Sequence, residues 1–575
     1  MLRRFRPPLP VRIIGQETGP GIGKGVAMEV GTGAGTGAET GPDRRSGRGS
    51  GAGPRRVAVV GAGPAGLLTA RMVGLLLPGA EVEVYERGEP GEASGFGVTL
   101  SARTLGGIAG ADPDTHRRIV GASLPLSGID IALPGRTLRY DGFEVASISR
   151  HTLLTILREQ AEAVGARIRY RRAVPPETLS DADVVALADG AASAHRTARA
   201  AGFGTTTLTG AARFVWLGTD APFEPRTSFA FVRTPYGPMA AHCYPHADAG
   251  ATVVVETDEA TWRAAGFGGN ASGPLGDDRL GMLSEVFAEH LGGRKLVGDR
   301  NRWSRFTVVT NRRWSVGNTV LLGDAAHTAH FTVGSGTKLA LEDAIALATA
   351  LSGHRDRAEA FDAYERARRG PVERTQRLAA PSMRWWEGFG RRLDLPAEEF
   401  GLHFLTRTPA MTLAALRRRC PDRLAEAEAA FRRRAGDGRP DAARHAVDTP
   451  FRLGPAALPN RLLSLPAPGL RLREPECPDD PDWSEDDILS VPNAGVGADA
   501  DVIVVGAGAP PWECWHETLR YASALRAESG TPVAVRVPAD WRDGPGLDAD
   551  EDSWSARIHL ALLAGRIDLV ALDGR

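Results

Sequence analysis

Three glycines, Gly61, Gly63 and Gly66, follow the short apolar segment Val57–Val60 in the spacing Gly-x-Gly-x-x-Gly. Between a strand and a helix, the first glycine of this pattern permits a tight turn, the second lets the backbone approach a pyrophosphate, and the third lets the helix pack on the strand. The N-terminus of that helix presents free N–H groups and a partial positive charge to the phosphates. Glu86 ends the next strand-like segment and can accept hydrogen bonds from a ribose diol. The pattern therefore predicts a dinucleotide site.

The same glycine spacing also arises by chance, because 69 of the 575 residues are glycine. The segment 33–38 fits Gly-x-Gly-x-x-Ala, but it follows no strand pattern and precedes no helix pattern. The segment 502–508 does follow a strand pattern, but Pro510 and Pro511 oppose a helix after its glycines. The copy at Gly61 is the one that combines strand, turn, helix, second strand and acidic residue.

Two further segments place a carboxylate directly after an apolar strand pattern. In one of them the chain runs into a turn at Asp189 and Gly190. In the other, Asp324 can accept hydrogen bonds from sugar or ribitol hydroxyls, and Gly336 leaves room before a helix that begins near Thr337. The free N–H groups of that helix can face an anion such as the pyrimidine edge of a flavin. These two segments favour a flavin nucleotide over a nicotinamide nucleotide.

The pattern around these motifs is that of an α/β fold. Val57–Val60 predicts a strand, Leu67–Leu77 a helix and Glu81–Tyr85 a second strand, which together form a βαβ unit. A helix capped by Ser149 is predicted to end at Gly165. Further elements of this layer are predicted at Asp183–Leu187 and Val320–Leu322, as strands, and at Thr337–Leu351, as a helix.

Between about residues 205 and 300 the pattern changes to short β-branched and aromatic segments separated by Pro, Gly and Asp turns. Such segments predict antiparallel strands, which are Phe214–Leu217, Ser228–Arg233, Ala240–Tyr244 and Thr252–Glu256. The predicted fold class is therefore α/β, or more broadly α+β, with a Rossmann-like nucleotide-binding domain into which an antiparallel sheet is inserted.

Composition narrows the classes of function. The formal net charge of -1 gives no clustered basic excess, so nucleic acid is not an expected partner. The four cysteines contain no CxxC pair, which predicts reduced thiols in a cytoplasmic protein and no metal site. The longest apolar run, residues 57–77, is interrupted by four glycines, Pro64 and Arg71, so no membrane span is predicted.

Residues 1–54 differ in character from the rest of the chain. They are rich in Gly, Arg, Thr and Pro and show neither a helical nor a strand period. Residues 1–56 carry ten Lys/Arg and four Asp/Glu, a local excess of +6. Such a composition predicts a disordered leader. A tail that binds nucleic acid or another partner is the alternative.

The three motif blocks resemble the GxGxxG, DG and GD motifs of the flavoprotein aromatic hydroxylases, the family of p-hydroxybenzoate hydroxylase. The resemblance runs from about residue 55 to residue 434 and implies a GR2-type FAD domain with an antiparallel substrate sheet. Arg150 matches an arginine that the family sets against FAD, Asp324 would bind the ribitol, and Lys338 would offer its backbone N–H to the flavin. The FAD-binding residues implied in this way are Gly61, Gly63, Gly66, Glu86, Arg87, Arg150, Asp189, Gly190, Asp324, Gly336, Thr337 and Lys338.

The resemblance also implies a chemistry. In this family NADH or NADPH reduces FAD, O₂ adds to the flavin C4a atom, and the resulting hydroperoxide transfers an electrophilic oxygen to an electron-rich ring. The sequence shows no second Rossmann unit, so the nicotinamide would bind transiently. The implied function is an FAD-dependent aromatic monooxygenase. A flavin-binding scaffold without turnover is the alternative from another class.

One position departs from the wider family, because Phe331, preceded by His330, stands where that family has a proline. The segment HTAHF-x-x-GSGTKLA-x-EDAIAL is similar to the subgroup that contains salicyloyl-CoA 5-hydroxylase, anthraniloyl-CoA monooxygenase and the violacein-pathway tryptophan hydroxylase. This similarity implies that His330 and Phe331 lie beside the reacting oxygen. Trp216 and His242 are candidates for the ring pocket, with core packing as the alternative for each.

The subgroup also suggests a substrate. Two of its members act on aromatic thioesters, so the resemblance implies an anthraniloyl-type or salicyloyl-type acyl group on CoA or on a carrier protein. A free aromatic or an indole derived from tryptophan is the alternative.

The C-terminal part is predicted to hold helices and then a Pro-rich linker over residues 437–487. Residues 449–453 and 459–461 resemble the opening of an old-yellow-enzyme barrel, and residues 531–536 and 560–570 resemble its final strands. A (β/α)₈ barrel needs at least ~200 residues, whereas about 130 remain here. We therefore expect a truncated, barrel-like remnant without FMN. The predicted parts are a leader (1–54), a monooxygenase domain (55–395, with its substrate sheet at about 205–300), a helical extension (396–440), and the linker with the remnant (441–575).

Overall fold

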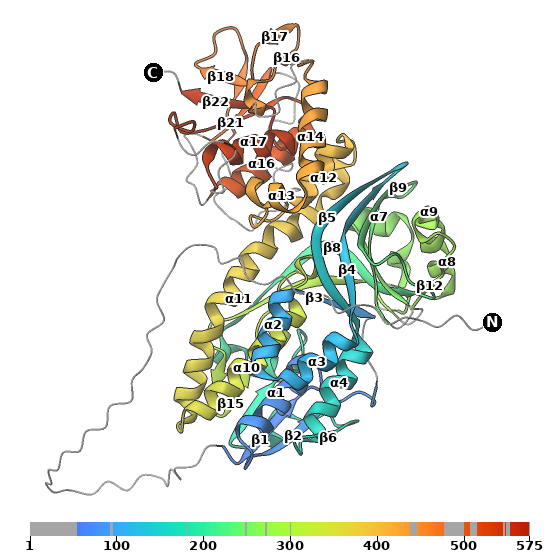
Figure 1. Cartoon of the computed structure of the whole chain (residues 1–575), viewed down its shortest axis with the longest axis vertical. Coiled ribbons are helices and arrows are strands. Elements are labelled where there is room, and N and C mark those ends of the chain that lie inside the picture. The colour runs from blue at the N-terminus through green and yellow to red at the C-terminus, as the bar shows by residue number, and fades with distance from the viewer. Residues whose placement is uncertain are drawn as a thin grey trace, which may run out of the picture. The chain divides into compact units, whose positions relative to one another are not determined.

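A computed structural model of the chain describes residues 54–91, 96–179, 181–247, 250–270, 273–298, 301–437, 445–475, 500–506, 514–543, 547 and 552–573 (Figure 1). The leader predicted for residues 1–54 lies outside this part of the chain, apart from Pro54.

The first β-sheet has six strands in the order β14-β15-β7-β1-β2-β6. All neighbouring pairs are parallel except β14 with β15. The strands are β1 (Arg56–Val60), β2 (Glu81–Tyr85), β6 (Arg167–Arg169), β7 (Val184–Leu187), β14 (Ser315–Val316) and β15 (Thr319–Leu321). The predicted βαβ unit is confirmed. Because β1, β2, β7 and β15 are adjacent and parallel, the motifs that follow them meet at one edge of the sheet, where such folds bind nucleotides.

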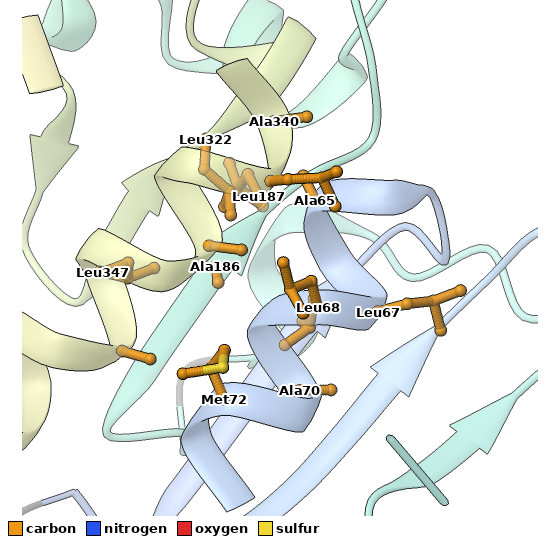
Figure 2. Close-up of a cluster of buried hydrophobic side chains, with 14 of the residues drawn as sticks. Ala65, Leu67, Leu68, Ala70, Met72, Ala186, Leu187, Leu322, Ala340 and Leu347 are labelled. Carbon is orange, nitrogen blue, oxygen red and sulfur yellow. The ribbon is translucent and has the colours of Figure 1, made fainter. Parts of the chain in front are cut away.

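Two helices on this sheet hold the motif turns in place. They are α1 (Pro64–Leu76), which follows the glycine motif, and α10 (Gly336–Gly353), which follows the second carboxylate motif. Figure 2 shows Leu68 of α1 among Ala186 and Leu187 of β7, with Leu347 of α10 beside them. Leu68 is fully buried, and burial of one such side chain stabilises the fold by about 1.5–3 kcal/mol. The remaining helices of this region are α2 (Ala102–Ala111), α3 (Pro113–Gly121), α4 (Arg150–Glu162), α5 (Ala194–Ala198) and α6 (Ala200–Phe203).

The second sheet has nine strands, with the order β12-β8-β11-β10-β9-β4-β5-β3 and with β13 paired to β8. Its strands are β3 (Gly97–Leu100), β4 (Leu124–Leu133), β5 (Arg136–Ser149), β8 (Thr205–Thr219), β9 (Thr227–Thr234), β10 (Gly237–Pro245), β11 (Ala251–Thr257), β12 (Leu296–Val297) and β13 (Ser304–Asn311). The four predicted strands are confirmed within β8 to β11. The sheet is larger than predicted. Strands β3, β4 and β5 come from residues before 205, where the predicted sheet begins, and β13 lies after residue 300, where it was predicted to end.

Alternation along β8, β10 and β11 gives this sheet two different faces. Val215, Leu217, Val253 and Val255 pack in an apolar cluster with three helices, which are α7 (Glu259–Ala264), α8 (Asp277–Val286) and α9 (Ala288–Leu291). The residues between them, such as Trp216 and Val254, line a cavity on the opposite face. The period of two residues along a strand is the cause of this division.

The long helix α11 (Arg357–Glu387) leads to the C-terminal part of the chain. Three helices follow, α12 (Ala397–Leu405), α13 (Leu413–Arg419) and α14 (Pro421–Arg434). A parallel sheet in the order β18-β22-β21-β20-β19 then packs against them. Its elements are β18 (Leu462–Leu465), β19 (Leu472–Arg473), β20 (Val502–Val505), α16 (Trp515–Ser529), β21 (Val533–Arg536), α17 (Trp554–Leu563) and β22 (Leu569–Asp573).

Two details of the C-terminal prediction differ from the structure. The described part of the Pro-rich span is not a plain linker, because it contains β18, β19 and the hairpin of β16 (Phe451–Leu453) and β17 (Ala456–Leu458). Residues 560–570 are not one strand, because Leu560–Leu563 belong to α17 and the strand begins at Leu569. The short apolar run in α17 is buried all round, and periodicity alone does not separate a buried helix from a buried strand.

No helix in the described ranges is long and apolar enough to cross a membrane.

Candidate active site

The glycine motif forms a tight turn in which two glycines pack against the protein backbone and the third, Gly63, faces open space. A Cβ atom at Gly61 would lie 2.4 Å from the carbonyl oxygen of Ala188, and one at Gly66 would lie 1.9 Å from the carbonyl oxygen of Gly61. A Cβ atom at Gly63 would meet no described atom within 4 Å. Gly61 and Gly66 are therefore required by the protein's own packing, whereas the open space at Gly63 fits a ligand pyrophosphate.

Glu86 lies at the end of β2 and holds this turn. Its Oε2 atom accepts a hydrogen bond of 2.8 Å from the backbone N–H of Ala62, and its Oε1 atom accepts one of 2.8 Å from the N–H of Gly88. Its carboxylate also lines a small cavity of about 50 Å³ with His151. Each oxygen keeps further acceptor capacity, so a bond to a ribose hydroxyl is compatible with this arrangement. Arg87, in contrast, is exposed and does not line this cavity.

Arg196 joins the two carboxylate motifs. It donates hydrogen bonds to the carbonyl oxygen of Ala325, at 3.0 Å, and to that of Ala191, at 2.5 Å. Asp189 is fixed by the Nδ1 atom of His195, 3.1 Å from its Oδ2 atom, while its Oδ1 atom is buried without a hydrogen-bond partner in the described ranges. Gly190 has a φ of 86°, which a glycine adopts without strain.

Asp343 of α10 organises the second carboxylate motif. Its Oδ2 atom accepts hydrogen bonds from the backbone N–H of Gly323, at 2.9 Å, and from the Nε2 atom of His327, at 2.8 Å. Its Oδ1 atom accepts a bond of 2.8 Å from Arg368. These bonds and Arg368 hold the pKa of the buried carboxyl below its usual value, although burial alone opposes this. His327 thus helps to hold Asp343 in place.

A cavity of about 390 Å³ lies between the motif edge of the first sheet and the inner face of the second. Asp324, Gly336 and Thr337 line one side of it, together with Arg150 from the start of α4. The backbone N–H groups at the start of α10, which include that of Lys338, have no intrahelical acceptor. The side chain of Lys338 lies 3.5 Å from Glu342.

Buried polar atoms on this side of the cavity fit a bound flavin nucleotide. The Nε atom of Arg150 and the Oγ atom of Ser335 are buried without a hydrogen-bond partner in the part of the chain that the structure describes. Burial lowers the pKa of Arg150, and the nearby Asp324 opposes that effect. Buried polar groups without partners are rare in native proteins, so a polar ligand that reaches them is consistent with this arrangement.

Aromatic side chains form the other side of the cavity. The ring of Phe331 lies 4.9 Å from that of Phe214, 5.9 Å from that of Trp216 and 4.5 Å from that of His330, measured between ring centroids. Phe214, Trp216, Phe331 and His242 all line the cavity. The structure therefore brings three of the four residues singled out for catalysis and ring binding to one wall. His330 lies behind Phe331, buried and stacked on it.

A buried polar cluster lies behind this wall. The Nε2 atom of His242 is 2.8 Å from the Oε2 atom of Glu256, and the Nε2 atom of His330 is 3.9 Å from its Oε1 atom. Burial raises the pKa of Glu256 well above its usual value and lowers that of His242 well below it. It also lowers the pKa of His330 to about 3. Burial therefore favours the neutral form of each of the three side chains, and the positive charge of Arg407 opposes this effect at Glu256.

Sequence reasoning assigned no role to Glu256, Arg407 or Asp343. Asp343 fell within the segment that carried the resemblance, and Glu256 ended a predicted strand. A carboxylate in this otherwise apolar strand was the signal that could have drawn attention to Glu256. Arg407 follows α12 in the helical extension, and no local pattern connects it with β11.

Comparisons with known proteins show the family to which the chain belongs. A family model described as an FAD binding domain matches residues 135–379. The chain is 40% identical over 420 residues to salicyloyl-CoA 5-hydroxylase from a Streptomyces species, a match that covers 71% of this chain and 79% of that protein. The chain belongs to the family of FAD-dependent aromatic hydroxylases.

Two further relatives match a smaller share of this chain, and one of them has a lower sequence identity. The chain is 40% identical over 343 residues to 3-hydroxy-4-methyl-anthranilyl-(aryl-carrier protein) 5-monooxygenase of Streptosporangium sibiricum, covering 60% of this chain and 91% of that protein. It is 27% identical over 368 residues to protodeoxyviolaceinate monooxygenase of Chromobacterium violaceum, a match that covers 62% of this chain and 95% of that protein.

Substitution of Asp324 tests the ribitol contact that the resemblance implies. We expect Asp324→Ala to lower FAD affinity by about 1–3 kcal/mol, because ribitol hydroxyls enclosed in the complex would lose their acceptor. Asp324→Asn keeps one acceptor oxygen and should lose less. Equilibrium dialysis of the two apoproteins with FAD measures the difference, with circular dichroism as the check on folding. Wild-type affinity in a folded Asp324→Ala protein would show that this carboxylate does not contact the cofactor.

Proposed function

We propose that this enzyme hydroxylates the aromatic ring of an acyl thioester, of the salicyloyl or anthraniloyl type, carried on CoA or on a carrier protein. The support comes from two relatives at 40% identity whose names specify such thioesters, one on CoA and one on an aryl-carrier protein. The aromatic wall of the cavity agrees with a ring-shaped substrate.

The chain's own residues would bind and orient the two reactants. We assign FAD to the side of the cavity formed by Arg150, Asp324 and the start of α10, and the substrate ring to the side formed by Trp216 and Phe331. FAD, when bound, takes electrons from NADH or NADPH and activates O₂. Phe331 and the buried His330 behind it would keep water from the face of the ring that is attacked, which protects the reaction from side reactions.

We also propose the division into a monooxygenase domain (55–395), a helical extension (396–440) and a C-terminal barrel-like remnant (441–575). The five parallel strands with α16 and α17 between them support a shortened (β/α) unit. The parts share an apolar core, because Phe231 of β9, Phe404 of α12 and Leu525 of α16 belong to one buried cluster.

A substrate screen tests the proposed function. We expect salicyloyl-CoA or anthraniloyl-CoA, or the same acyl groups on a carrier protein, to stimulate NAD(P)H oxidation at least tenfold more than the free acids do at equal concentration. The product should gain one oxygen atom by mass spectrometry. Hydrogen peroxide measured in parallel separates hydroxylation from uncoupled oxidation.

The second candidate is a free aromatic or indolic substrate. It is favoured by the match to protodeoxyviolaceinate monooxygenase over 95% of that protein, although at 27% identity. This candidate would replace the first proposal if free acids or indoles were hydroxylated in step with NAD(P)H oxidation while the thioesters did not react.

A further inference from the structure

Glu256 lies between two cavities. On one side, His242 contacts it and lines the candidate active-site cavity. On the other side, His330 approaches it and lines a second cavity of about 420 Å³ between β8, β13 and α11. The exposed Arg377 also lines this second cavity, which therefore reaches the surface.

The polar atoms of this cluster lack the partners that buried groups normally have. Glu256 is 0% exposed, and neither of its carboxyl oxygens has an aligned hydrogen bond in the part of the chain that the structure describes; the same holds for the Nε2 atom of His242. An unsatisfied buried polar group costs about 1–3 kcal/mol. The distance of 2.8 Å between the histidine and the carboxyl is that of a hydrogen bond, so a small rotation of either side chain aligns them.

Neighbouring hydroxyl groups hold His330, the member of the cluster that lines the second cavity. The Nδ1 atom of His330 lies 2.8 Å from the hydroxyl of Thr332, which lies 2.9 Å from the hydroxyl of Ser382. The Nε atom of Arg407 donates a hydrogen bond of 3.1 Å to Ser382. Arg407 is the charged group that faces Glu256 and both histidines, and its charge favours loss of a proton from each of them.

A proton has to leave the active site if a hydroxyl on the substrate ring ionises there. Such a hydroxyl has a pKa near 10 in water, as in tyrosine, and its anion releases more electron density into the ring than the neutral form does. We infer that Glu256 carries the proton of a substrate ring hydroxyl from His242 to His330 and so to the water of the second cavity. This inference rests on the proposed function and deepens it, because it assigns a ring with an ionisable hydroxyl.

The transfer balances without any further reactant. The O–H bond of the ring hydroxyl breaks and its proton moves to His242, while the Nε2 proton of His242 moves to the Oε2 atom of Glu256. The proton that leaves the Oε1 atom of Glu256 passes to the Nε2 atom of His330 and then to water. The ring keeps the electron pair as a phenolate, and the three side chains end with the number of protons with which they began.

Glu256→Gln tests the transfer, because it keeps the shape of the side chain but cannot exchange a proton at neutral pH. The oxidised holoenzyme is mixed with salicyloyl-CoA without NAD(P)H in a stopped-flow instrument. Phenolate absorbance, an indicator dye for released protons, and the flavin spectrum as the signal of binding are followed together. We expect ionisation of the bound ring to be at least tenfold slower in Glu256→Gln than in the wild type, with a Kd within threefold. His330→Gln should show the same slow phase.

Two controls separate this role from a structural one. Glu428→Gln alters another buried Glu–His pair, in which the Nε2 atom of His559 lies 3.1 Å from Glu428, and it should ionise the ligand at the wild-type rate. The 2-methoxybenzoyl thioester has no ionisable hydroxyl and should perturb the flavin without releasing a proton.

The outcomes are distinct. Wild-type ionisation rates in Glu256→Gln would overturn the transfer while leaving the proposed function intact, and if that variant does not fold, wild-type rates in His330→Gln would do the same. A flavin spectrum that no phenolic thioester perturbs would overturn both.

Discussion

A Gly61→Ala variant is expected to lose most of its folded protein, whereas Gly63→Ala is expected to fold normally and to lose FAD. At Gly61 the φ of 100° disfavours alanine, and the new Cβ atom would lie 2.4 Å from the backbone oxygen of Ala188. The strain alone costs about 1–3 kcal/mol, and relief of the contact requires β7 to move away from β1. We expect a total loss of at least about 3 kcal/mol in the free energy of unfolding.

Gly63 is the matched control at the same turn. Its φ of -76° suits alanine, and no described atom lies within 4 Å of the new Cβ atom. The fold should therefore be unaffected or slightly stabilised, because alanine has less freedom in the unfolded chain. The methyl group would occupy the space that we assign to the pyrophosphate, so FAD affinity should fall at least tenfold.

Thermal unfolding of the apoproteins and flavin absorbance of the purified proteins measure the two effects separately. Full FAD binding by Gly63→Ala would show that the pyrophosphate does not approach this turn. Normal stability of Gly61→Ala would show that the close packing of β1 against β7 is not required.

Deletion of residues 445–575 is expected to yield insoluble protein. The helix α12 is buried over seven consecutive residues, Glu399–Leu405, and α16 and α17 provide much of the apolar core around it. His403 of α12 joins Trp385 of α11 to Ser523 of α16 through hydrogen bonds of 2.8 and 2.9 Å. Removal of the segment would expose this apolar surface to water, and exposed patches of this kind cause aggregation.

A point variant tests the same interface in a soluble protein. Arg566 is 4% exposed and donates hydrogen bonds to the carbonyl oxygens of His403 and Thr406. Arg566→Ala would leave these buried acceptors with fewer partners, and we expect the free energy of unfolding to fall by about 2–4 kcal/mol.

Arg542→Ala is the control within the same segment, because this exposed side chain pairs with Asp448 at the surface and its loss should cost at most about 1 kcal/mol. Chemical denaturation measures both variants. Soluble, cooperatively folded protein after the deletion would show that the C-terminal segment is dispensable for the fold.

The same interface connects the C-terminal segment to the candidate active site. Trp386 of α11 lies next to Trp385, and its ring centroid is 4.1 Å from that of His242. A shift of α11 would therefore move the residue that contacts Glu256. We attribute to the C-terminal segment a supporting role for the wall of the substrate cavity.

The sequence alone determined the nucleotide-binding half of this protein, because its signals are local. A turn such as that at Gly61 and a capped helix start such as Ser149 each depend on a few neighbouring residues. Parallel strands present their carboxyl ends at one edge of a sheet, so motifs placed after strands could be expected to meet. The predicted inserted sheet likewise supplied Trp216 and His242 as candidates for the ring pocket.

Only the tertiary structure decided which distant residues complete the site. Glu256 on β11, His330 before α10 and Arg407 after α12 have no local pattern in common, and folding alone places them together. The pairing of β4 with β9 and the packing of α12 on α16 also join segments far apart in the chain. Side-chain contacts of this kind depend on burial and on sheet register, which local spacing does not specify.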